Sequence, residues 1–116
     1  MTTALKTPRF RLETLLDESG RTRAQKLAAL ATVNLGVVEA LSNGAMQPDD
    51  ATAAFFNAEN CLWVHRRLKS SAADEIMSRG VQLGDLFEAL PPSKAKIEFA
   101  KELKTIRRLC VSLLRR

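Results

Sequence analysis

The sequence predicts an all-α fold, a single compact bundle of about five to six helices over residues 1–116 with no sheet. Apolar residues recur at helical spacing along most of the chain, and no stretch alternates convincingly with period two. Alanine and leucine supply most of the apolar residues, whereas the aromatic residues that favour strands make up only 5% of the chain. Proline, glycine and serine interrupt the helical pattern at short intervals, which is typical of a bundle with short connections.

The first two helices are predicted near residues 8–19 and 22–43. Pro8 suits the first position of a helix, because its ring fixes a helical φ and its missing N–H has no partner there in any case. Thr22 and Gln25 have the spacing of a capping box, in which each side chain bonds the backbone N–H of the other residue. A glycine shortly after each apolar pattern predicts where the helix ends.

A long third helix is predicted near residues 48–69, and a short fourth one near 71–79. Pro48 and the two acids after it favour a helix start, since negative charge stabilises the positive end of the helix dipole. The serines at 70 and 71 indicate a break followed by a new cap. Gly80 is expected to end the fourth helix.

The last two helices are predicted near residues 83–90 and 93–114. Pro91 and Pro92 stop the fifth helix, because proline lacks the N–H that a helix interior requires. Ser93 is the expected cap of the sixth helix.

The predicted helix at 48–69 is apolar on two nearly opposite sides, whereas a surface helix normally has one apolar stripe. One interpretation is that this helix is packed in the middle of the bundle. The other is that its second side binds a partner, because large aromatic residues and arginine are typical anchors of protein interfaces. We call this second side the aromatic stripe; it comprises Phe56, Asn60, Trp63 and Arg67.

The predicted helix at 93–114 combines an apolar seam with a basic face. Phe99, Leu103, Ile106, Cys110 and Leu113 follow the spacing of a coiled-coil seam. Residues 93–116 carry a net charge of +6, whereas residues 1–92 carry −1. Four interpretations of this helix remain open. Its charged side is solvated, or that side binds a nucleic-acid backbone, or it binds an acidic protein or membrane surface, or the seam pairs with another chain. The basic face comprises Lys101, Lys104, Arg107, Arg108 and Arg115.

No catalytic residues are predicted, because the sequence contains no glycine-rich phosphate loop and no metalloprotease or serine-hydrolase motif. Cys61 and His65 lie four residues apart on one side of a helix, but neither a third orienting group nor a second ligand pair is evident. Both are therefore expected to be core residues, and the two cysteines, Cys61 and Cys110, to be reduced. No metal site, cofactor or small-molecule substrate is predicted.

The interpretation that we favour is a non-enzymatic protein-interaction module that binds a protein partner or itself through apolar helix faces. The expected state is a homo-oligomer, and the expected location is the cytoplasm, since the sequence suggests neither a signal peptide nor a membrane span. The alternative is a nucleic-acid-binding protein that uses the basic face. Sequence-specific DNA recognition is disfavoured, because Lys94, Ala95 and Lys96 at the start of the helix offer no Asn, Gln or Arg to read bases.

Overall fold

A computed structural model describes residues 11–18, 20 and 22–115. Within these residues the chain forms seven α-helices and no strand, which confirms the predicted all-α class. The number exceeds the predicted five to six because one predicted helix is divided. The helices are α1 Leu12–Asp17, α2 Arg23–Ser42, α3 Pro48–Ala54, α4 Ala58–Leu68, α5 Ser71–Gln82, α6 Asp85–Ala89 and α7 Pro92–Leu114.

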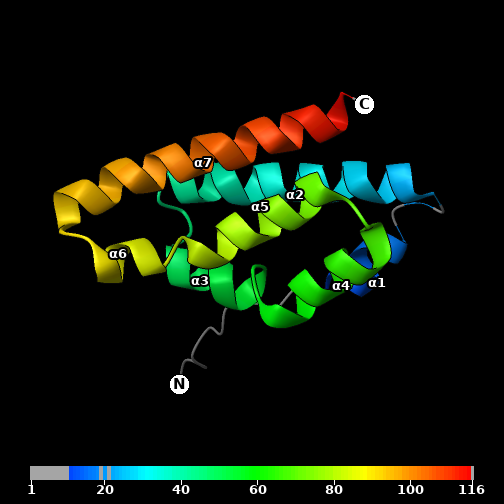
Figure 1. Ribbon diagram of the computed structural model, residues 1–116, viewed down its shortest axis with the longest axis horizontal. Helices are drawn as coiled ribbons and strands as arrows, with labels where there is room; N and C mark the ends of the chain where they lie inside the picture. The colour runs from blue at the N-terminus through cyan, green and yellow to red at the C-terminus, as the bar shows by residue number, and fades with distance from the viewer. Residues whose placement is uncertain (1–10, 19, 21, 116) are drawn as a thin grey trace, which may run out of the picture.

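The two longest helices, α2 and α7, lie side by side and run in opposite directions along one edge of the molecule (Figure 1). The shorter helices α3, α4 and α1 form the opposite edge, and α5 runs between the two edges. Helix α6 makes the corner that connects α5 to α7. This arrangement leaves one long side of α7 with no helix of the described chain packed on it.

The core is built from α2, α5 and α7 together with buried residues of α1, of α4 and of the break between α3 and α4. The buried residues of α2 recur every three or four positions, so they form one side of the helix and face the same neighbours. The seam of α7 is part of this core: Leu103, Ile106, Cys110 and Leu113 are buried within the chain, and Phe99 packs against them partly exposed. The apolar half of α7 therefore covers α2 and α5.

The predicted continuous helix at 48–69 is wrong, because the chain breaks between α3 and α4. Phe55 has φ −132°, outside helical geometry, and the Asn57 side chain accepts a hydrogen bond from the N–H of Asn60 to cap α4. The break lets Phe55 and Phe56 both enter the core, where their rings meet edge to face with centroids 5.0 Å apart.

The other helix boundaries follow the prediction to within a few residues. The capping box of Thr22 and Gln25 is present at the start of α2. Helix α5 continues past Gly80 to Gln82, and α7 begins at Pro92 rather than at Ser93. Residues 8–10 and 19 of the first predicted helix lie outside the described residues.

Candidate functional site

The aromatic stripe does not form one exposed surface. Phe56 and Asn60 are 0% and 2% exposed, Trp63 is partly buried, and only Arg67 is fully accessible. Phe56 lies in the break between α3 and α4, whereas Asn60, Trp63 and Arg67 lie on α4 itself and become more accessible toward its C-terminal end. Phe56 and Asn60 therefore have no surface to offer a partner in this structure.

Asn60 has a structural role instead. Its Oδ1 accepts a hydrogen bond from the backbone N–H of Leu12 at 3.1 Å, and its Nδ2 donates one to the carbonyl of Phe55 at 2.9 Å. The side chain thus connects the first residue of α1 to the break before α4. A buried amide is stable when both of its ends are paired, as they are here.

The basic face of α7, in contrast, is exposed along its whole length. The side chains of Lys101, Lys104, Arg107, Arg108 and Arg115 are all accessible. Their spacing of three, four and seven residues keeps them on the side of α7 that points away from the core. Within the described part of the chain, the last four of them have no carboxylate within ion-pair distance.

The two acids of α7 do not neutralise those four cations. Glu102 accepts hydrogen bonds on both carboxylate oxygens from Nη1 of Arg79, each at 3.0 Å, and so joins α7 to α5. Glu98 lies 3.6 Å from Nζ of Lys101, one turn away on the same helix. The positive charge of Lys104, Arg107, Arg108 and Arg115 therefore remains directed at solvent.

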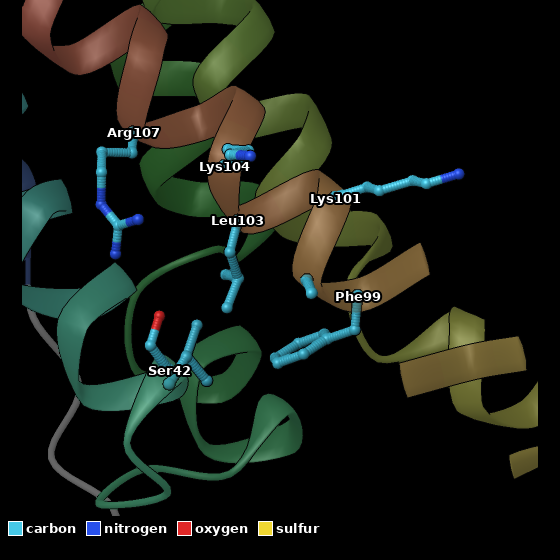
Figure 2. Close-up of a pocket in the computed structure, with 8 residues that line it drawn as sticks. Ser42, Phe99, Lys101, Leu103, Lys104 and Arg107 are labelled. Atoms are coloured by element: carbon cyan, nitrogen blue, oxygen red, sulfur yellow. The ribbon is translucent and has the colours of Figure 1, made fainter. Parts of the chain in front are cut away.

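An apolar groove lies beside the basic face, where the C-terminal end of α2 meets α7 (Figure 2). It has a volume of about 380 Å³. Figure 2 shows Phe99, Leu103 and Arg107 reaching from α7 toward Ser42 of α2, whereas Lys101 extends away. We call this feature the α2–α7 groove; its lining is Leu41, Ser42, Phe99, Ala100, Lys101, Leu103, Lys104 and Arg107.

A second, shallower hollow runs along α7 itself, among the side chains of the basic face. Its volume is about 660 Å³, and Val111 and Ser112 lie between the cations that line it. Lys104 and Arg107 line both this hollow and the α2–α7 groove. The two depressions therefore lie next to each other, and Lys104 and Arg107 stand between them.

The expectation that His65 is a core residue is wrong: its side chain is exposed, and its Nδ1 lies 3.0 Å from Oδ2 of Asp74 on α5. This pair could not be predicted from the sequence, because the turn between α4 and α5 brings the two residues together. Cys61 and Cys110 are free thiols, and Cys61 lines a surface depression with His65 and Asp74. Burial, and to a smaller extent the charge of Asp74, raise the pKa of the Cys61 thiol, which disfavours the nucleophilic thiolate.

No group of three or more His, Cys, Asp or Glu side chains in the described residues is arranged to hold a metal ion. The helices of this part of the chain also lack the combination of length and apolarity that a membrane crossing requires. The chain matches no protein-family model, no curated protein sequence and no solved structure.

Proposed function

We propose that this protein is a non-enzymatic interaction module whose basic face on α7 binds an acidic protein partner. One observation carries the proposal: Lys104, Arg107, Arg108 and Arg115 are exposed on one side of a helix and have no ion-pair partner among the described residues. Some other cations of the described chain are paired, for example Lys26 with Asp17 at 3.1 Å, whereas Arg66, Arg67 and Lys69 near the end of α4 are also exposed without an ion pair and therefore serve as the control below. Unpaired charge of one sign attracts a partner of the opposite sign and speeds its association.

Burial raises the pKa of the Cys61 thiol, which disfavours nucleophilic catalysis by this residue. His65 of α4 pairs with Asp74 of α5, and the surface depressions that these two residues line contain no residue of the basic face, so the two features do not combine into one site. The exposed cations of α7 are therefore the surface feature that supports a binding function.

The proposal is tested with fluorescein-labelled poly-L-glutamate as the acidic probe and fluorescence anisotropy as the readout. Neutralising Lys104, Arg107 and Arg108 together to alanine is expected to weaken binding by about threefold to 150-fold. Three surface ion pairs contribute roughly 0.2–1 kcal/mol each, and about 1.4 kcal/mol corresponds to a factor of ten.

The matched control is the triple alanine variant of Arg66, Arg67 and Lys69, three exposed cations near the end of α4. It removes the same formal charge and is expected to bind the probe nearly as tightly as the wild type. Equal loss in both variants would mean that only net charge matters, and the assignment to α7 would be wrong. A loss in the α4 variant alone would move the site to Arg67 and its neighbours.

Nucleic acid is a second candidate, because the same exposed cations would contact a phosphate backbone. A labelled DNA duplex distinguishes the two candidates. Duplex binding that exceeds poly-L-glutamate binding, falls steeply with added salt and is abolished by charge reversal at Lys104 and Arg108 would place nucleic acid first.

Self-association also stays a prediction. The seam of α7 and the residues Phe56 and Asn60 are covered by the chain's own helices, so an interface between copies would need another surface. Light scattering coupled to size exclusion, at low and high salt, measures the oligomeric state directly.

A further inference from the structure

The α2–α7 groove has a floor and a rim of different chemistry. The floor consists of the apolar side chains Leu41, Phe99 and Leu103, of which Leu41 and Leu103 are buried and Phe99 is partly accessible. The rim consists of Lys104 and Arg107 of the basic face, and the Arg107 side chain extends along the groove toward α2 (Figure 2). A ligand that filled the groove would bury apolar surface and meet positive charge at the same time.

We propose that the α2–α7 groove receives an acidic amphipathic segment of a partner protein, with an apolar side chain on the floor and carboxylates against the rim. This inference rests on the proposed function and adds to it the chemistry of the partner. Charge complementarity argues for it, because the rim is cationic and has no acid of the described chain within ion-pair distance of Lys104 or Arg107.

The helical form of the rim sets the spacing expected in the partner. Lys104, Arg107 and Arg108 follow one another within about one turn of α7, which advances about 5.4 Å. A helix lying along α7 repeats its own side chains at the same interval, so carboxylates three or four positions apart would face these cations in turn. Docking of an amphipathic helix in an apolar groove is an established mode of peptide recognition.

The floor argues against nucleic acid as the occupant. A phosphate backbone could pair with Lys104 and Arg107. It is polar, however, and would gain no hydrophobic binding energy from contact with Leu41 and Leu103. An acidic peptide uses both the floor and the rim.

The test uses a synthetic fluorescein-labelled helical peptide with leucines along one side and glutamates beside them. A second peptide has the same glutamates but serine at every leucine position. Ala100 is exposed and lines the groove, so Ala100→Trp fills the groove without removing a cation or a core residue. The matched control is Ala24→Trp, an exposed alanine in the first turn of α2, about 27 Å along that helix from Ser42.

The wild type is expected to bind the leucine peptide at least about tenfold more tightly than the serine peptide. Ala100→Trp should remove that preference, whereas Ala24→Trp should bind both peptides within about twofold of the wild type. Circular dichroism and thermal unfolding confirm that both variants are folded.

The outcomes separate this inference from the proposed function. If the triple alanine variant of Lys104, Arg107 and Arg108 loses the peptide but Ala100→Trp does not, the basic face binds and the groove inference is wrong. If neither the triple alanine variant nor Ala100→Trp weakens peptide binding, both the proposed function and the groove inference are wrong. Equal binding of the two peptides, with competition by a DNA duplex, would overturn the inference in favour of nucleic acid. A wild-type dimer that Ala100→Trp converts to a monomer would make a second copy of the chain the occupant.

Discussion

The ring of Phe56 occupies the place where a side chain on Gly80 would stand. A Cβ built on Gly80 overlaps the ring, and Phe56 is 0% exposed, so the ring is enclosed by the core. This contact explains why α5 continues through a glycine: the missing side chain lets α5 approach the aromatic pair at the end of α3.

Gly80→Ala is expected to lower the free energy of unfolding by about 1–3 kcal/mol, the usual cost of overpacking a core. The same substitution at Gly36 provides the control, because nothing lies within 4 Å of the added Cβ there. Alanine is the better helix former, so Gly36→Ala should raise stability by about 0.5–1 kcal/mol. Urea unfolding followed by circular dichroism measures both. Stabilisation by both substitutions would contradict the close contact between Phe56 and Gly80.

Replacing each of the two buried asparagines, Asn34 and Asn60, by leucine should change stability by different amounts. Leucine has nearly the same shape as asparagine but forms no hydrogen bonds. Asn60→Leu leaves the N–H of Leu12 and the carbonyl of Phe55 without their partner, and is expected to cost about 2–4 kcal/mol. Asn34 donates to the carbonyl of Leu30 at 3.1 Å, but its buried Oδ1 has no partner in the described chain. Asn34→Leu removes that unpaired oxygen and should change stability by less than about 1 kcal/mol, or increase it. If urea unfolding gives the same loss of unfolding free energy for both variants, the two amides contribute equally to stability and the expected difference is wrong.

Lys69 ends α4 in the left-handed conformation, with φ 47°, which glycine adopts without strain. Lys69→Gly is therefore expected to stabilise the protein by about 0.5–1 kcal/mol, after allowing for the greater freedom of glycine in the unfolded chain. Lys96→Gly, within α7, should instead destabilise it by about 1 kcal/mol. Thermal unfolding of the two variants measures the difference. A loss of stability in both would contradict the assigned geometry at Lys69.

The two thiols should differ in their reaction with iodoacetamide near pH 8. Burial raises the pKa of Cys110 to about 12, so its thiol stays protonated, and its side chain is inaccessible in the folded state. Cys61 is only partly buried, so it should react first, though more slowly than a free thiol because its pKa is also raised. Mass spectrometry of timed samples separates the two sites. Modification of Cys110 should follow global unfolding and accelerate in urea; rapid modification without urea would contradict its burial.

Local chemistry made most of the helix boundaries predictable. The capping box of Thr22 and Gln25 and the proline at the start of α3 act within one turn of the chain, so their effects need no knowledge of the fold. The break after α3 had a signal too, since Asn57 is a good capping residue. Good helix formers on both sides of it favoured a continuous helix, and the packing of Phe55 and Phe56 in the core depends on other helices that the local sequence does not show.

The candidate site was predictable in part for the same reason. A basic face opposite an apolar seam can be identified from helical periodicity alone, and the cations of α7 are exposed as that pattern requires. The α2–α7 groove could not be predicted, because it exists only where Leu41 and Ser42 of a distant helix meet α7. The role of Asn60 was missed for a similar reason, since its partner Leu12 lies on another helix.

The pairing of α2 with α7 has a consequence for biosynthesis. Helix α7 leaves the ribosome after every other helix described here, yet it supplies the most extensive cover for α2. Until α7 emerges, the nascent chain carries a long helix whose leucines and valines have little to pack against. Folding then depends on contacts between residues far apart in the chain, which slows it relative to bundles with local contacts. During that interval the apolar side of α2 is exposed, which favours aggregation of the unfinished chain. Chaperones that recognise apolar helices could bind to it at this stage.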